Sequence, residues 1–243
     1  MPEASCKCCE KIINRQIETP VARHEWGYLR SKREFPTKNK KKRKTHIILH
    51  RVDGTPLRVP VKDYSAPVFL YKFSEARILS GLPYGTDHLR WTVVILTDHN
   101  AEMEMKRKYP EWDQRHILKA QPYEFARLLA KIAYGYVIAE VGIDTFRPLV
   151  IDIILGRSDD YFYTVGGIWD ISPPVSGGDH ITNISIKFIS SDRALIIVDI
   201  RLFSAAETPS FHVVVGEIDF NDPKHVHAFE KHRRDGKLEE IPS

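Results

Sequence analysis

The stretch PYEFARLLAKIAYGYVIAEV, residues 122–141, is the clearest helical pattern in the chain. Pro122 stands at its start and Gly142 just past its end, which is the usual asymmetry of an α-helix. Apolar side chains recur along it at helical spacing, at Phe125, Leu128, Leu129, Ile132, Val137, Ile138 and Val141. We therefore predict one long helix with an apolar side over these residues.

The residues after this helix predict a second, shorter helix and then a series of strands. Residues 147–155 are nearly all apolar and are followed by Gly156, which indicates a short buried helix that ends there. The later segments are rich in β-branched residues, as strands are, and the expected strands are 161–165, 181–189, 195–203 and 211–218.

Before the long helix, a hairpin is the strongest local signal. Asp53-Gly54 lies between the apolar runs 46–52 and 55–61, which is typical of a tight turn that joins two antiparallel strands. Further strands are expected at 68–73 and 90–97. Together these elements predict an α+β fold, with a mainly antiparallel sheet, one long helix and one short buried helix.

The two ends of the chain differ in character from this middle part. Residues 4–33 predict helices, and Thr19-Pro20 is typical of an N-cap and first position, so a second helix is expected to start there. We predict three segments: a helical appendage with the basic loop over 1–45, an α+β domain over 46–220, and a charged tail over 221–243 that frays.

The composition is that of a globular protein, with 42% hydrophobic and 28% charged residues and a net charge of +4. No apolar run reaches the roughly 18 residues that cross a bilayer, so a membrane protein is not expected. The N-terminus lacks the basic-then-apolar pattern of a signal peptide. We therefore expect a cytoplasmic protein, whose thiols are kept reduced.

The three cysteines, Cys6, Cys8 and Cys9, lie within four positions. This spacing argues against a structural disulfide framework and leaves metal ligands or free thiols. Cys6-x-x-Cys9 has the spacing of one arm of a zinc knuckle, but a structural zinc needs about four ligands. His24 is the nearest candidate for a further ligand. A pair of free thiols, or the remainder of a lost site, is the alternative.

Six of the seven residues from 38 to 44 are cations: Lys38, Lys40, Lys41, Lys42, Arg43 and Lys44. Such a run can bind phosphates without reading a base sequence, so nucleic acid is a possible partner. The alternative is a solvated loop whose charges repel each other.

No complete catalytic set is recognisable among the remaining polar residues. The acids nearest the apolar elements match no template, and they are Asp152, Asp159, Asp160 and Asp170. A hydrolase that uses the acids near Asp159 is a further, weaker hypothesis. His225, His227 and His232 lie in a polar segment, which favours a charged tail over a metal site.

Several stretches together resemble the bacterial HNH-endonuclease-like proteins. The similarity covers the second cysteine pair of that family and its C-terminal region. It is found at residues 4–12, 17–18, 27–30, 35–37, 125–133, 146–149 and 154–156.

In that family a first cysteine pair and a Glu-His motif precede the second pair. The resemblance therefore implies that Cys6 and Cys9 are zinc ligands, and that the partner cysteines and the catalytic histidine are absent from this chain. It implies a nucleic-acid-associated protein without the nuclease core, from a truncated reading frame or one whose start is placed too late. The alternative is a non-catalytic protein-interaction domain.

Overall fold

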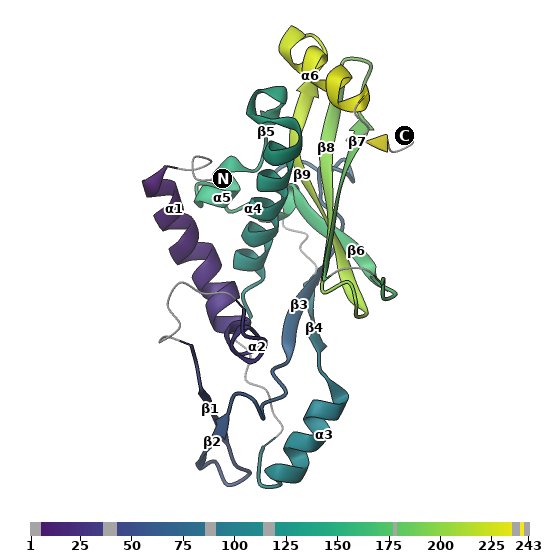
Figure 1. The fold of residues 1–243 in the computed structure, drawn as a ribbon. Coiled ribbons are helices and arrows are strands. Elements are labelled where there is room, and N and C mark those ends of the chain that lie inside the picture. The colour runs from purple at the N-terminus through teal and green to yellow at the C-terminus, as the bar shows by residue number, and fades with distance from the viewer. Residues whose placement is uncertain are drawn as a thin grey trace. The chain divides into compact units, whose positions relative to one another are not determined.

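The computed structural model, drawn as a ribbon in Figure 1, describes residues 6–35, 43–85, 91–113, 120–176, 179–234 and 239–240. The chain forms two compact units that alternate along the sequence. Unit 1 comprises Met1–Ile17, Tyr71–Thr92 and Pro122–Ser243, and unit 2 comprises Glu18–Leu70 and Val93–Gln121.

A mainly antiparallel sheet is the centre of unit 1. Its strands follow the order β10-β7-β8-β9-β5, and β6 also pairs with β9. The pairs β7–β8, β8–β9, β6–β9 and β5–β9 are antiparallel, whereas β10 runs parallel to β7. The strands are β5 (Arg147–Pro148), β6 (Val165–Ser172), β7 (His180–Phe188), β8 (Arg193–Leu202), β9 (Thr208–Asp219) and β10 (Glu239–Glu240).

The long helix α4 (Pro122–Val141) packs on this sheet and has the bounds expected from the sequence (Figure 1). Phe125 is fully buried, with its ring centre 5.4 Å from that of Phe211 on β9 and 5.2 Å from that of Tyr71. Phe73 and Phe162 extend the same aromatic cluster, with ring centres 5.0 Å apart. The helix thus buries its apolar side on the sheet of its own unit, which the sequence left open.

The short buried helix is confirmed, although it begins later than expected. The chain first forms β5 and then α5 (Ile151–Leu155), because residues 147–148 pair with β9. Gly156 ends α5 with a φ of +69°, a left-handed conformation that glycine adopts without strain.

Two further predictions in this half of the chain need correction. Tyr161–Tyr163 form the 3₁₀ turn η4 rather than a strand, and β6 begins only at Val165. The charged segment after 221 does not fray throughout, because Pro223–Arg234 form the helix α6. Phe229 accounts for the helix in this segment, because it is buried and its ring centre lies 5.1 Å from that of Phe220.

The described N-terminal residues are helical, as predicted, with a bend at Trp26 before the last helix. The helix α1 (Lys7–Ile13) continues into the π-helix η1 (Asn14–Glu25), and α2 (Gly27–Lys32) follows. Pro20 lies inside η1, so the expected restart at Thr19-Pro20 is wrong. A π-helix bonds residue i to residue i−5, as Trp26 N does to Val21 O, and so does not depend on the i−4 contact that proline disrupts.

In unit 2 the predicted hairpin is confirmed. The strands β1 (His46–His50) and β2 (Pro56–Pro60) are antiparallel, with Ile47 opposite Val59. Gly54 has a φ of +85°, and the Asp53 carboxylate accepts hydrogen bonds from the backbone N–H and hydroxyl of Thr55. Both residues of the Asp-Gly signal therefore build the turn.

The core of unit 2 joins this hairpin to the helix α3 (His99–Lys108), which the sequence did not predict. Met105 is the buried residue of α3, and Trp112 follows the helix. The cluster consists of Ile47, Leu57, Val59, Tyr64, Ala66, Met105 and Trp112. Asp98 caps α3, since its carboxylate accepts the N–H of Ala101.

The strands β3 (Val68–Phe73) and β4 (Trp91–Leu96) lie within the predicted ranges and pair with each other. The boundary between the units falls within each of these strands. The predicted α+β class is therefore confirmed. The three-part division at residues 45 and 220 stays a prediction, and the compact units have other boundaries because the chain returns to unit 1 twice.

Candidate functional site

The cysteine pair lies at the start of α1, where Cys6 is the N-cap residue. The Cys6 and Cys9 sulfurs are 3.0 Å apart, and the backbone N–H of Cys9 donates to Cys6 Sγ at 3.2 Å. The hydrogen bond between the two side chains lowers the pKa of the Cys6 thiol and raises that of Cys9. Cys6 and Cys8 are exposed, and Cys9 is half-buried.

These two thiols do not make a zinc site by themselves, because a structural zinc takes about four ligands. Across the described residues, no group of three or more His, Cys, Asp and Glu side chains is placed to hold a metal ion. His24 lies in η1 and belongs to no such group. The residues present therefore supply half of a zinc site, and zinc binding stays a prediction.

Of the basic segment, residues 38–44, Lys38, Lys40, Lys41 and Lys42 lie outside the described residues. Its last two cations are described. The Arg43 Nη2 donates to the Phe35 carbonyl at 2.9 Å, and Lys44 Nζ lies 4.1 Å from the centre of the Tyr28 ring. Both cations are thereby held next to α2.

Two cations of the neighbouring helix α2 make the same kind of contact. Arg30 donates to the Ala22 carbonyl at 3.2 Å, and Lys32 donates to the Tyr64 carbonyl at 2.8 Å. Within the described ranges, none of Arg30, Lys32, Arg43 and Lys44 forms an ion pair with a carboxylate. Carbonyls and rings orient these cations but leave their positive charge uncompensated.

The cations of α3 are arranged differently. Lys106 pairs with Glu102 at 3.1 Å, and Lys108 pairs with Asp63 at 3.0 Å and with Glu104 at 3.3 Å. The hydrogen bond from Lys108 lowers the pKa of Asp63. The charge of this helix is therefore largely neutralised within unit 2.

The charge of the chain is divided unequally between its two units. Unit 2 contains 18 Lys and Arg against 10 Asp and Glu, a net charge of +8. Unit 1 contains the other 18 Lys and Arg against 22 Asp and Glu, a net charge of −4. The overall charge of +4 therefore conceals one strongly basic unit.

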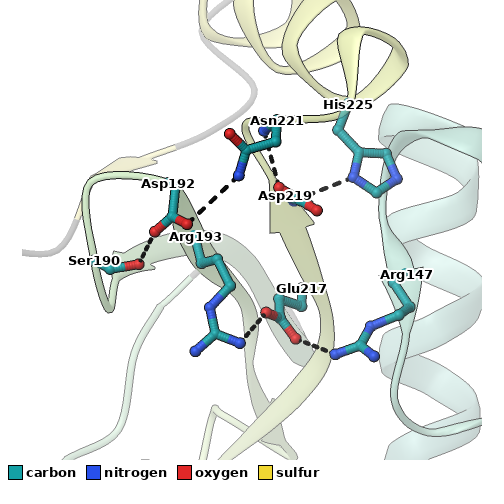
Figure 2. Close-up of polar contacts among 8 residues, drawn as sticks. All are labelled: Arg147, Ser190, Asp192, Arg193, Glu217, Asp219, Asn221 and His225. Carbon is teal, nitrogen blue, oxygen red and sulfur yellow. Dashed lines mark hydrogen bonds and ion pairs between the residues drawn. The ribbon is translucent and has the colours of Figure 1, made fainter.

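Figure 2 shows a group of polar contacts in unit 1, at the end of β9. Glu217 is 7% exposed and forms ion pairs with two arginines, Arg193 at 3.1 Å and Arg147 on β5. Each arginine bonds a different carboxylate oxygen, and both guanidinium groups are largely exposed. With both its oxygens engaged, Glu217 fastens β5 and β8 to β9.

The rest of this network organises the start of α6. Asp192 accepts from Ser190 at 2.5 Å and from Asn221 at 3.5 Å, and the N–H of Asp219 donates to His225 Nδ1 at 3.1 Å (Figure 2). These hydrogen bonds join the turn between β7 and β8 to the turn between β9 and α6. We infer that they fix this end of the sheet.

The remaining acids singled out from the sequence are not gathered at one site. Asp160 forms a buried ion pair with Arg77 and also accepts the N–H of Gly85 at 2.7 Å. Asp152 is exposed on α5 and lies 3.6 Å from Arg157. Asp159 and Asp170 join no metal-binding group among the described residues, and the hydrolase hypothesis gains no support. His227 is exposed on α6, and the side chain of His232 lies outside the described residues.

One buried titratable residue has no signal in the sequence. His212 on β9 is 8% exposed, and burial lowers its pKa to about 4. Its Nε2 accepts the N–H of Ala76 at 3.0 Å, so the ring is neutral and fastens the segment after β3 to the sheet. A lone histidine in a strand does not indicate such a contact.

Among the described residues, no helix has the length and apolar character needed to cross a membrane. Comparison with protein families, with functionally described proteins and with solved structures yields no match to this chain.

Proposed function

We propose that this protein binds nucleic acid through unit 2, using the basic segment together with Arg30 and Lys32, and that it does not cleave the bound strand. The observation that supports this is the net charge of +8 on unit 2, beside −4 on unit 1. A concentrated positive field attracts a polyanion, whereas the same charge spread over the chain would not.

The contacts of the described cations favour phosphate binding over internal pairing. A cation that is already paired with a carboxylate gains little from a phosphate, because its charge is compensated. Arg30, Lys32, Arg43 and Lys44 bond carbonyls or an aromatic ring instead. They can therefore exchange counterions for phosphates, and such contacts give affinity without base specificity.

The non-catalytic part of the proposal rests on the engagement of the acids and on the resemblance noted in the sequence. The carboxylates of Glu217 and Asp160 are bound by arginines, and no catalytic histidine carries over from the family that the sequence resembles. Cleavage of plasmid DNA by the purified protein in the presence of a divalent cation would contradict this part.

The test is the salt dependence of binding to a duplex oligonucleotide, measured by fluorescence anisotropy at low and moderate salt. We compare the wild type with a variant in which Lys40, Lys41, Lys42, Arg43 and Lys44 are all replaced by Gln. Each phosphate contact contributes about −0.9 to the slope of log K against log salt. The variant should lose up to about 4.5 of that slope if all five cations contact phosphates.

The matched control replaces Lys106, Arg107 and Lys108 by Gln. These residues also lie in unit 2, but Lys106 and Lys108 are paired with carboxylates. Their replacement should change the slope by about 1 or less. Slope losses in proportion to the charges removed, five in the segment variant and three in the control, would mean that net charge alone drives binding and that the basic segment is not the contact. No binding by the wild type at low salt would contradict the proposal and favour a protein-interaction domain.

A further inference from the structure

We propose that Cys6 and Cys9 form a reversible disulfide with each other, by exchange with a low-molecular-mass disulfide. The pair lies in unit 1, apart in sequence from the basic segment, and the inference does not depend on nucleic-acid binding.

The positions of the two sulfurs carry this inference. They are 3.0 Å apart, and a disulfide bond is about 2.05 Å long, so an approach of about 1 Å completes it. The N–H of Cys9 also bonds Cys6 Sγ at 3.2 Å, which holds the Cys6 sulfur over the first turn of the helix. Cys6 is exposed and Cys9 is half-buried, so both side chains have room to rotate and close this distance.

The surroundings leave the two thiols available for this reaction. Among the described residues, the two sulfurs belong to no group of three or more His, Cys, Asp and Glu side chains placed to hold a metal ion. Cys6 is exposed, which admits a small disulfide. Cys8 is exposed as well, but in the described part of the chain no thiol–thiol contact involves it.

The reaction proceeds in two exchanges. The Cys6 thiolate attacks one sulfur of the small disulfide, whose S–S bond breaks and releases one thiolate. The Cys9 thiolate then attacks the Cys6 sulfur of the mixed disulfide and releases the second thiolate. The protein loses two electrons and two protons, and the small disulfide becomes two thiols. In a reducing compartment, such as the cytoplasm expected from the sequence, the bond would be transient.

The experiment uses the full chain, first reduced and treated with a chelator, then freed of both reagents and exposed to oxidised glutathione. Intact-mass spectrometry and peptide mapping follow the products. We expect the wild type to lose two hydrogen atoms and to contain a Cys6–Cys9 bond. Cys8→Ser should behave in the same way. In the Cys8→Ser background, Cys6→Ser and Cys9→Ser should instead retain a glutathione adduct on the remaining cysteine, since no second thiol is left to resolve it.

Three results would overturn the inference. The first is stable glutathione adducts on both Cys6 and Cys9 of the wild type, without an internal bond. The second is a mapped bond that contains Cys8. The third is about one zinc ion per purified chain before the chelator, because the sulfurs would then be held as metal ligands.

Discussion

Unit 1 and unit 2 differ in the size of their apolar cores and in their net charge. Unit 1 has a broad apolar core in which Phe125, Phe211 and Tyr71 are almost fully buried between α4 and the sheet, and its net charge is −4. Unit 2 has a cluster of seven buried residues around one hairpin and one helix, and its net charge is +8.

This difference separates the requirements of folding from those of recognition. Strong positive charge opposes compaction through self-repulsion, so a unit that concentrates cations needs them solvated or bonded to neutral groups. In unit 2 the cations of α2 and the end of the basic segment bond carbonyls and a ring.

The largest effect is expected from Phe125→Ala in unit 1. The change removes a fully buried ring from the aromatic cluster and leaves a cavity, so the free energy of unfolding should fall by about 3–5 kcal/mol. Urea unfolding followed by circular dichroism measures this loss. Tyr123→Ala is the control on the same helix, because Tyr123 is 47% exposed and should change stability by about 1 kcal/mol or less. Equal losses would mean that α4 is not fastened by its buried face.

Met105→Ala should give the next largest effect, in the core of unit 2. Met105 is fully buried, and its truncation should reduce the free energy of unfolding by about 2–4 kcal/mol. Met103, two residues earlier on α3, is 52% exposed, so Met103→Ala should change it by about 0.5 kcal/mol or less. The same urea series measures both variants. A larger loss for Met105→Ala than for Phe125→Ala would contradict the expectation that the core of unit 1 contributes more to stability than the core of unit 2.

A pH-dependent effect of intermediate size is expected from His212 in unit 1. Its pKa in the folded protein is about 4, below the ordinary value of 6.5, so the unfolded chain takes up the proton first as the pH falls. The stabilisation is complete above about pH 6.5 and is lost as the pH decreases towards 4. When the pH is lowered from 7 to 4.5, protonation of His212 in the unfolded chain should decrease the free energy of unfolding by about 2 kcal/mol.

His212→Gln keeps an acceptor for the Ala76 N–H and removes the titration. Urea midpoints of the two proteins at several pH values should therefore diverge, with the wild type losing more stability towards acid. Parallel curves would show that His212 does not take up a proton on unfolding in this range.

The smallest effect is expected where unit 2 has paired surface charges. Replacing both Lys106 and Lys108 by Gln removes three ion pairs, yet exposed pairs contribute only about 0–1 kcal/mol each. The thermal midpoint should shift little, and less at high salt than at low salt. A large loss would mean that these pairs stabilise unit 2, and the triple replacement would then be unsuitable as a binding control.

The elements predicted correctly are those whose local chemistry agrees with their packing. Pro122 and Gly142 bound α4 because both ends obey the capping asymmetry. The Asp53-Gly54 turn forms because both residues satisfy it locally. The secondary structure of a segment could not be predicted where it depends on a contact that is distant in sequence. Arg147 belongs to a strand because it pairs with β9, although the residues around it are typical of a helix.

Three other features had no usable signal. Along α3 the polar residues prevail and Met105 alone is buried, so no apolar periodicity marks the helix. Pro20 inside a π-helix contradicts the usual meaning of Thr-Pro. The excess of cations in unit 2 lies within residues 18–70, with 13 Lys and Arg against 5 Asp and Glu, and residues 93–121 hold 5 of each. Only the fold assigns these two stretches to one unit and the rest of the chain to the other, so the division of charge between the units has no signal in the sequence. Of the candidate site, the sequence identified the thiol pair and the basic segment but not the carbonyls that hold Arg43 and Lys32.

The alternation of the two units along the chain has a consequence for the order of events on the ribosome. Every residue of unit 2 precedes Pro122, whereas α4 and all the strands that pair with β9 follow from Pro122 onward. At a translation rate of about 5–20 residues per second, the synthesis of residues 122–243 takes on the order of ten seconds. The basic unit can therefore be complete while the nascent chain still lacks the sheet of unit 1, and a polyanion could bind unit 2 before that sheet has formed.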